Sequence, residues 1–479
     1  MSETSTPPIT APAGAPGGGS LRRVLKLRHL VAFGLAYLAP TVVFNLYGIV
    51  TEMTGGMMAL AYLITTVVMF FTAYSYAVMV KEYPIAGSAY TYVRRAVNPW
   101  LGFFTGWVML LDYLLLPMVC YLLVGIYMNT FVPAVPVAVW VIGLAVLVAA
   151  INIVGVKTAG RINTVVVGAQ ILFCVAVVVI AGVYVSQGGG DGVLLDPKAL
   201  LNVETFDGPN LLWASSILAA AFLGFDAVST MAEETVEPRK TVPRAIMIVC
   251  VGGGAAFAVI SYFTQIAWPT AYRDLTDPDT GVFELLPRIG GDALATTFLV
   301  IDNFGSVICA LVGLAAVSRL LFGMGRDGVL PRRFFGKLST RFGTPVNNIL
   351  LTSAIALTAL LYADNLLGAA SLVSFGALSG FIMVNYSVIS HFFIRGKRRS
   401  GTDVIRYLVV PGLGVLVCLV LWLNVDLSAK LLGLAWLTVG IVYMAIRSRG
   451  FRRPPPSMQL DEDADTDRDE AALGNEQGR

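Results

Sequence analysis

Charged residues are scarce in this chain: Asp, Glu, Lys and Arg make up 13% of its 479 residues, against about 25% in a typical soluble protein. Histidine occurs twice and cysteine five times, without a CxxC pair or any other metal-site spacing. All five cysteines lie in apolar segments, so we expect buried thiols, no metal and no cofactor. These shortages exclude a soluble enzyme, a disordered chain and a secreted disulfide scaffold.

The chain has long uncharged runs instead. Residues 30–51 and 53–80 hold no charge, and about 20 such residues form a helix that crosses a membrane. Because the runs are continuously apolar, they also exclude a barrel of alternating strands. The sequence predicts an all-α membrane protein with twelve transmembrane helices, at about residues 29–52, 56–80, 101–128, 134–155, 163–186, 210–232, 245–268, 293–323, 346–363, 366–394, 406–425 and 431–447.

Both ends of the chain differ from this twelve-helix domain, which we place at residues 23–447. Residues 1–22 are rich in Pro, Gly, Ser and Thr, and residues 448–479 become acidic, so we expect two disordered tails. Of the 33 Lys and Arg residues, 29 lie in these tails and in the loops on the same side of the membrane. Positive loops are typical of the cytoplasmic side, so we expect both termini there. No clustered basic face is visible, so we expect the lipid bilayer, and not a nucleic acid, as the partner.

Three carboxylates fall inside predicted spans, where a charge costs about 2.5–3.5 kcal/mol or more. Asp112 lies in the third span, Asp226 in the sixth and Asp302 in the eighth, and no Lys or Arg lies at comparable depth. A site built from these acids would accept positive charge. The alternative is structural: each acid is protonated or is hydrogen-bonded to a neighbouring helix.

The first and sixth spans also contain helix-breaking residues. Pro40 lies in the middle of the first span and removes a backbone hydrogen bond, and Gly224 lies close to Asp226 in the sixth. Transporters with inverted repeats bind their substrate where two helices break at corresponding positions. An ordinary kink and a close-packed glycine are the alternative. The pattern predicts a five-plus-five inverted repeat followed by two extra helices, at about residues 29–186, 210–394 and 406–447.

Two loops on the predicted cytoplasmic side carry denser patterns. Residues 83–92 combine Pro, Gly and aromatic residues, which suits a segment at the membrane interface. Residues 232–246 place acids close to bases, so Glu233, Glu234 and Arg239 are candidates for a cytoplasmic gate. A solvated loop is the alternative for any one of these residues.

Several segments resemble the amino acid–polyamine–organocation superfamily, and the similarity extends over about residues 22–447. They are YPIAGSAYTY (83–92), NPWLGFFTGW (98–107), FLGFDAVSTMAEETVEPRKTVPRAI (222–246) and SRLLFGMGRDGVLP (318–331). Within the superfamily, the bacterial putrescine importer group is the most similar at GLAYLAPTVVFNLYGIV (34–50) and LLDYLLLPM (110–118). The resemblance implies the inverted-repeat fold in the plasma membrane, a central site between spans 1, 3, 6, 8 and 10, and alternating access.

The chain departs from the amino acid carriers of this superfamily at the first break. In those carriers, a Gly-rich break exposes amides that hold the substrate carboxylate, whereas Ala39, Pro40 and Thr41 here include no Gly. The fifth span also lacks the Lys that some proton-coupled relatives carry, so we do not transfer their coupling mechanism. The departure favours a substrate without a carboxylate.

The resemblance implies that Asp226 follows the second break directly and that Asp112 faces it from the third span. Two carboxylates with aromatic rings around them suit a linear diamine, since an aromatic face adds about 0.5–2 kcal/mol for each cation it touches. Asp112 and Asp226 are also the candidate proton carriers, and Asp302 is assigned to an outer vestibule. Lipid contact or core packing is the alternative for each aromatic residue. We predict that the substrate contacts Tyr37, Ala39, Pro40, Thr41, Asp112, Tyr113, Phe222, Gly224, Phe225 and Asp226.

The sequence therefore predicts a transporter, not an enzyme, that imports putrescine or a related amine, driven by the membrane potential and by proton symport. A dication gains about 4.6 kcal/mol from 100 mV, enough for about a thousandfold accumulation. An amino acid–proton symporter of the same fold is the alternative. A sensor that binds an amine without moving it is disfavoured, because the tails are too short and polar for a signalling domain. The exact amine, the coupling ion, exchange against import and the oligomeric state stay open.

Overall fold

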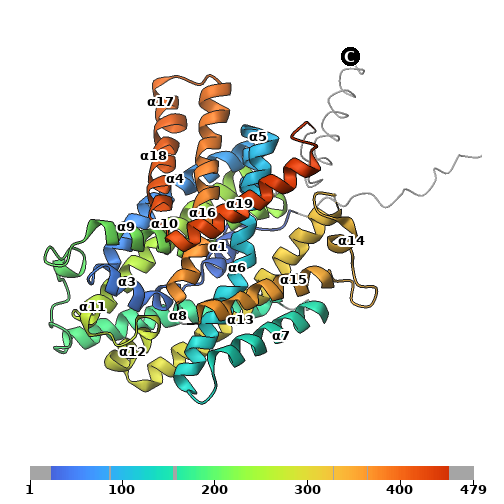
Figure 1. Ribbon diagram of the computed structural model, residues 1–479. Coiled ribbons are helices and arrows are strands. Elements are labelled where there is room, and N and C mark those ends of the chain that lie inside the picture. Colours follow the sequence, from blue (N-terminus) through green and yellow to red (C-terminus); the bar gives the residue numbers. More distant parts are fainter. Residues whose placement is uncertain (1–22, 86–87, 155–158, 327, 364, 453–479) are drawn as a thin grey trace, which may run out of the picture.

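The computed structural model describes residues 23–85, 88–154, 159–326, 328–363 and 365–452. The predicted tail at 1–22, and all of the other tail beyond residue 452, therefore lie outside the described residues. The described chain is helical, and Figure 1 shows its longer helices packed into one bundle. In chain order the α-helices are α1 (Leu27–Leu38), α2 (Val42–Asn45), α3 (Tyr47–Met53), α4 (Met58–Glu82), α5 (Ser88–Ala96), α6 (Pro99–Phe131), α7 (Val137–Val154), α8 (Ala159–Ser186), α9 (Gly208–Leu218), α10 (Pro238–Ala267), α11 (Ala271–Asp274), α12 (Val282–Gly290), α13 (Asp292–Arg326), α14 (Arg332–Phe335), α15 (Val346–Ala356), α16 (Leu366–Val388), α17 (Gly401–Val404), α18 (Val410–Leu423) and α19 (Leu427–Arg447).

Several of these helices continue as tighter or wider turns. Tighter 3₁₀ turns at Ala219–Phe222 and Ala227–Glu234 follow α9, and one at Leu357–Tyr362 follows α15. Wider π turns extend α16 through Ile389–Arg395 and precede α18 at Ile405–Val409. Because the chain crosses the bundle twelve times, both of its ends lie on the same side. We call this side the terminal side.

The spans agree with those predicted. Within the described residues, eleven helical segments are long and apolar enough to cross a membrane, and a shorter apolar segment, Val346–Tyr362, makes a twelfth. A helix that is apolar all round is stable in lipid because its backbone groups bond within the helix. The eleven segments are Leu27–Asn45, Met58–Glu82, Pro99–Phe131, Val137–Val154, Val165–Ser186, Gly208–Glu234, Pro238–Ala267, Asp292–Arg326, Leu366–Arg395, Gly401–Leu423 and Leu427–Arg447.

Polar residues directly before the apolar runs set where several spans begin. The side chain of Asn98 accepts a hydrogen bond from the amide of Leu101 at 2.8 Å, and α6 starts after it. Asp207 caps α9 in the same way, and Asn365 caps α16 through a 2.7 Å bond from the amide of Gly368. Each cap satisfies an amide that has no partner within the helix, which is typically worth about 1 kcal/mol.

The first span breaks where Pro40 predicted it. The α1 helix ends at Leu38, and Ala39 adopts a left-handed conformation with φ of +48° before α2 begins at Val42. The break leaves backbone groups without helical partners. One of them, the carbonyl of Pro40, accepts a hydrogen bond from the thiol of Cys174 on α8 at 3.4 Å. The break therefore faces α8 and is held by it.

The sixth span breaks at the predicted glycine. Gly224 has φ of +137°, and its amide donates a 3.0 Å hydrogen bond to the carboxylate of Asp226. A Cβ atom at this position would lie 2.7 Å from the carbonyl oxygen of Gly34 and 2.9 Å from the amide nitrogen of Leu38. The absence of a side chain thus lets the two broken spans meet backbone to backbone. Both breaks of the five-plus-five fold lie side by side in the middle of the bundle.

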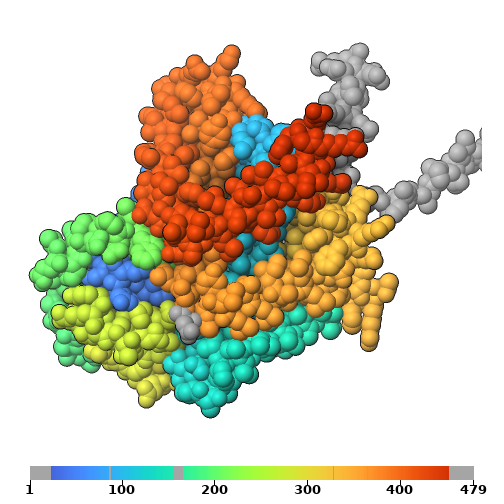
Figure 2. All heavy atoms as spheres, viewed as in Figure 1, coloured from blue at the N-terminus to red at the C-terminus, as the bar shows by residue number. Residues whose placement is uncertain are grey.

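Close helix pairs form the frame around the breaks. The second and seventh spans, α4 and α10, pack along one another, and α6 packs against both α13 and α16. The last two spans are added on the outside of α16, and Figure 2 shows α19, in red, lying across one face of the molecule. This arrangement encloses the breaks with α6, α8, α13 and α16.

The terminal side is closed beneath the breaks. The amides of Val24 and Leu25 both donate to the carbonyl of Glu234 at 2.9 Å, and the amide of Val236 donates to the carbonyl of Leu25. The chain before the first span is thereby joined to the chain after the sixth. The α5 helix packs against α6 and α16 nearby, and its Tyr92 is fully buried. The described residues Ser88–Tyr92 of the segment at 83–92 are thus packed against the protein.

Replacing Gly224 by Ala is expected to destabilise the fold. The new methyl group meets two backbone atoms within 3 Å, and the positive φ adds about 1–3 kcal/mol of strain. We expect a lower midpoint of thermal unfolding and a smaller monodisperse fraction for the purified protein in detergent. Gly252→Ala is the matched control, because a Cβ atom there meets nothing within 4 Å. Equal unfolding midpoints for the two variants would contradict the backbone contact.

Candidate functional site

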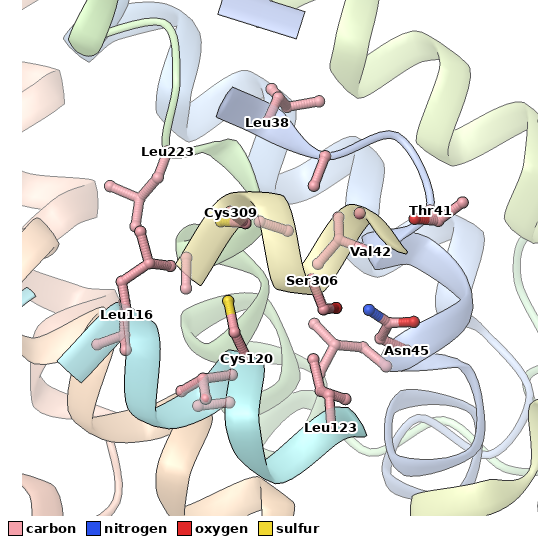
Figure 3. A pocket seen from close by; sticks show the side chains of 18 of the residues that line it. Leu38, Thr41, Val42, Asn45, Leu116, Cys120, Leu123, Leu223, Ser306 and Cys309 are labelled. Carbon is pink, nitrogen blue, oxygen red and sulfur yellow. The ribbon is translucent and has the colours of Figure 1, made fainter. Parts of the chain in front are cut away.

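A cavity of about 120 Å³ lies beside the break in the first span. Figure 3 shows side chains from α6, α13 and the segments around the break converging on it. Leu116 and Leu223 line it near the level of the breaks, while Asn45 and Leu366, the first residue of α16, lie farther from the terminal side. The cavity therefore lies between the two breaks and the side opposite to the termini.

Asp302 is the charged residue of this cavity. Among the described residues that line it, Asp302 alone carries a charge, and its carboxylate is 2% exposed. One carboxylate oxygen, Oδ2, has no hydrogen-bond partner in the described chain. The described lining includes no Lys or Arg, so the cavity presents a buried acid with an unused acceptor. Such a site has the chemistry to bind a positively charged group.

Neutral polar side chains surround Asp302. Thr41, from the break, and Asn45, one turn later, both lie beside its carboxylate. The amide of Gln170 on α8 donates a 3.0 Å hydrogen bond to the hydroxyl of Thr41, and the hydroxyl of Tyr127 donates to Asn45 at 3.3 Å. These bonds hold the side chains around the acid in place.

Asp112 and Asp226 lie outside the cavity, on its terminal side. Both are 3% exposed, and neither is among the residues that line the cavity. The hydroxyl of Tyr37 lies within electrostatic range of Asp112, Asp226, Tyr113 and Cys309. Since Tyr37 also lines the cavity, its side chain is near both the cavity and the pair of acids.

The packing around each acid of the pair is different. Asp112 lies where α6 meets α16, and Gly376 allows the contact: a Cβ atom there would lie 3.2 Å from the amide nitrogen of Asp112. Asp226 accepts the hydrogen bond from Gly224 and precedes the 3₁₀ turn at Ala227–Glu234. One acid therefore belongs to a continuous helix and the other to a break.

The remaining predicted contact residues divide between the cavity and the core. Ala39 and Thr41 line the cavity, whereas Pro40 and Gly224 shape the breaks and do not line it. Phe222 packs edge-on against Phe257 at 6.0 Å, in the core between the sixth and seventh spans. Phe225 packs against Tyr76 and Phe381 on the terminal side of the acids. In this conformation the two phenylalanines thus contribute to packing.

A sequence model of the amino acid permease family matches residues 29–436. The chain belongs to the amino acid permease family. It is 37% identical to the low-affinity putrescine importer PlaP of Escherichia coli strain K12, over 92% of this chain and 96% of that protein. It is 27% identical to the branched-chain amino acid permease BcaP of Bacillus subtilis, over 91% of this chain and 95% of that one. The permease is therefore an integral membrane transporter with the predicted fold.

The charged residues expected at the gate of the permease lie on the terminal side of the bundle. Arg239 forms no ion pair with Glu233 or Glu234 in the described chain, and it lines a separate groove on the terminal side. Glu234 takes part in the closure through its backbone carbonyl. The contact that joins the first and sixth spans is therefore a backbone contact.

Sequence reasoning missed several residues of the cavity. Asn45, Gln170 and Ser306 line the cavity. They are neutral polar residues in apolar spans, and this was the feature of the sequence that could have predicted them as site residues. Cys120 and Cys309 also line the cavity, and Figure 3 shows their sulfur atoms pointing toward one another. All five cysteines are free thiols; four are buried, as expected, whereas Cys309 is half-buried. Among the described residues, no group of three His, Cys, Asp or Glu side chains is placed to hold a metal ion.

Cys309 is expected to be the most reactive cysteine of the permease. It is half-buried and lines the cavity, whereas the other four thiols are buried. A small cationic methanethiosulfonate should therefore label Cys309 first, as followed by mass spectrometry of the purified protein. Ser306→Trp, which fills the cavity, should slow this labelling, and the buried Cys250 on α10 serves as the internal reference. Labelling of Cys250 as fast as Cys309 would contradict preferential access of the reagent to Cys309 through the cavity.

Proposed function

We propose that this permease imports putrescine or a closely related linear diamine. The observation that carries the proposal is the charge of the buried centre. Asp112, Asp226 and Asp302 are each at most 3% exposed, and the described lining of the cavity holds no Lys or Arg. The two ammonium groups of a diamine offset the charge of two of these acids, whereas a neutral amino acid adds a further carboxylate to the site. The similarity to PlaP, a putrescine importer by name, supports the same substrate.

The proposed route takes the diamine past Tyr37. The leading ammonium first meets Asp302 in the cavity, where one carboxylate oxygen has no described partner. Movement of the Tyr37 ring then opens the way to Asp112 and Asp226, which lie beyond it on the terminal side. Tyr113 adds a second aromatic ring near the pair of acids. An extended diamine can in this way contact an acid at each end.

Alternating access would move the two repeats against each other. We place the repeats at about residues 29–186 and 210–394, with extra helices at about 406–447. In the closed state observed here, the chain at Leu25 pairs with the chain at Thr235 on the terminal side. We propose that this pairing separates when the site opens there, with Glu233, Glu234 and Arg239 at the rim of the gate.

The orientation and the coupling belong to the same proposal. The excess of positive charge in the loops of the terminal side supports a cytoplasmic location for both termini, so that the cavity faces the outside. Asp226 and Asp112 are the proposed proton carriers, since a buried acid can exchange a proton in step with a cation. Substrate leaves chemically unchanged, without a cofactor.

An amino acid substrate is the second candidate, and the similarity to BcaP is the observation in its favour. The first break argues against it. Pro40 has no amide hydrogen, and Ala39–Thr41 include no glycine to expose further amides. A substrate carboxylate at this break would also lie close to Asp302, which is beside Thr41. The diamine therefore fits better.

Competition should distinguish the two substrates. We expect saturable uptake of labelled putrescine by proteoliposomes with an inside-negative potential, and inhibition by unlabelled diamines but not by neutral amino acids. Collapsing the potential should abolish most of the accumulation, because a dication gains about 4.6 kcal/mol per 100 mV. A pH gradient imposed at clamped potential tests the proton coupling in the same vesicles. Inhibition by leucine with no effect of diamines would move the assignment to an amino acid.

Removing the charge of one acid should weaken transport strongly. Asp302→Asn, Asp112→Asn and Asp226→Asn are each expected to lower kcat/KM for putrescine by roughly thirtyfold or more, since a buried charge pair that loses one partner costs at least about 2 kcal/mol. Asp292→Asn is the matched control: it lies on the same helix as Asp302 but is exposed. Wild-type uptake by Asp226→Asn and Asp302→Asn, with intact folding, would contradict the proposed site.

A further inference from the structure

A second, larger cavity of about 850 Å³ opens on the terminal side, far from the carboxylate site. It is a groove between the end of α4, the start of α10, the turns at Ile389–Arg395 and the start of the eleventh span. We propose that this groove binds the headgroup of an anionic phospholipid from the adjacent leaflet. The inference is independent of the transported substrate.

The groove is strongly basic. It is lined by one acid, Glu82, and by six cations: Lys81, Arg239, Lys240, Arg244, Arg398 and Arg406. Lys240 forms an exposed ion pair with Glu237 at 3.6 Å. Arg239, Arg244 and Arg406 have no ion pair with any described residue. Six positive charges thus converge on one hollow that a single acid, Glu82, lines, and such an excess of positive charge is the arrangement that binds a phosphate group.

One of these cations, Arg398, is held in position by aromatic rings. Two others lie at a helix N-terminus, where positive charge is unfavourable unless an anion is bound. The guanidinium of Arg398 lies 5.4 Å from the ring centre of Phe392 and 5.8 Å from that of Tyr407, whose hydroxyl accepts its hydrogen bond. Arg239 and Lys240 lie in the first turn of α10, which contains no acid, and the acidic N-cap residue Glu237 is paired with Lys240. Positive charge at a helix N-terminus is unfavourable because that end already carries a partial positive charge. A bound anion would reduce the repulsion between these cations and the helix N-terminus, and also the repulsion among the cations themselves.

The walls of the groove become apolar farther along the spans. Val78 and Tyr74 lie one and two turns deeper than Lys81 on α4, and Met247 and Ile248 lie about one turn deeper than Arg244 on α10. Ile248 is 46% exposed, so the apolar wall is open to the surroundings. Basic residues at the rim with exposed apolar residues below match a phospholipid, whose phosphate lies above its acyl chains.

The acidic C-terminal segment of the chain is the competing occupant. Residues 461–470 contain seven Asp and Glu residues, and the 27 residues after Arg452 are long enough to reach the groove, at about 3.3 Å per residue. The segment explains the positive charge but not the apolar wall, because its uncharged residues at 461–470 are only Ala464 and Thr466. The described chain also ends beside α6, where Phe451 packs against Trp100. The lipid accounts for both parts of the groove.

Lipid binding to the purified full-length permease tests the proposal. The protein in detergent is titrated with dioctanoyl phosphatidylglycerol, and the bound lipid is counted by native mass spectrometry. Arg244→Gln with Arg406→Gln should weaken binding roughly thirtyfold, since each basic residue near anionic lipid contributes about 1 kcal/mol. Arg333→Gln with Lys337→Gln removes the same charge from an exposed loop on the same side and should leave binding unchanged. Dioctanoyl phosphatidylcholine should bind weakly to all three proteins.

Additional variants and competitors in the same experiment identify the molecule that binds in the groove. Ile248→Ser should weaken the binding of phosphatidylglycerol but not that of glycerol phosphate. Glycerol phosphate that competes as well as the lipid would show recognition of a phosphate alone and would overturn the proposal. Truncation after Arg452 should leave lipid binding unchanged, and binding that appears only after truncation would assign the groove to the acidic segment. Equal lipid binding by the groove variant and the loop variant would also overturn it.

Discussion

The fold depends on how a membrane treats the peptide backbone. Lipid offers no hydrogen bonds, so every amide and carbonyl at membrane depth must find a partner within the protein. Ten of the twelve spans meet this constraint as helices without a break in the middle of the membrane, but the first and sixth spans interrupt their bonding at Ala39–Thr41 and at Gly224. Such interruptions are stable only where protein surrounds them. The packing of α6, α8, α13 and α16 around the breaks supplies that environment.

The polar groups released by the breaks shape the site. The carbonyl of Pro40 accepts a hydrogen bond from the thiol of Cys174, and the amide of Gly224 donates one to the carboxylate of Asp226. The hydroxyl of Thr41 accepts a hydrogen bond from the side-chain amide of Gln170. Asp302 then adds a charge to this neutral network. Each of these groups would be costly elsewhere in the membrane, and they are tolerated here because they satisfy one another or face the cavity. A site for a transported cation needs both satisfied polar groups and an acid that faces the cavity, because the substrate must bind readily and leave again.

The centre of the bundle and its terminal side carry charges of opposite sign. Toward the centre, acids are buried without cations, whereas on the terminal side Arg and Lys residues collect around the groove between α4 and α10. The same electrostatic rule explains both placements: an isolated charge in lipid is expensive, and it is found only where a counter-charge or water can reach it. In the proposed function that counter-charge is the transported amine in the centre, and in the proposed groove it is the lipid headgroup.

The sequence by itself determined the class of the protein, the twelve spans, both breaks and the three buried acids, because hydropathy, Pro40 and Gly224 act locally along one chain. The tertiary structure decided which of these residues share a cavity. Asp302, expected at a vestibule, lines the cavity, whereas Asp112 and Asp226 lie outside it near Tyr37. Asn45 and Gln170 line the cavity without having been predicted. Phe222 turns into the core against Phe257. The reason is that lipid selects residues by their depth, whereas convergence depends on how helices far apart in sequence cross and rotate, which no local pattern records.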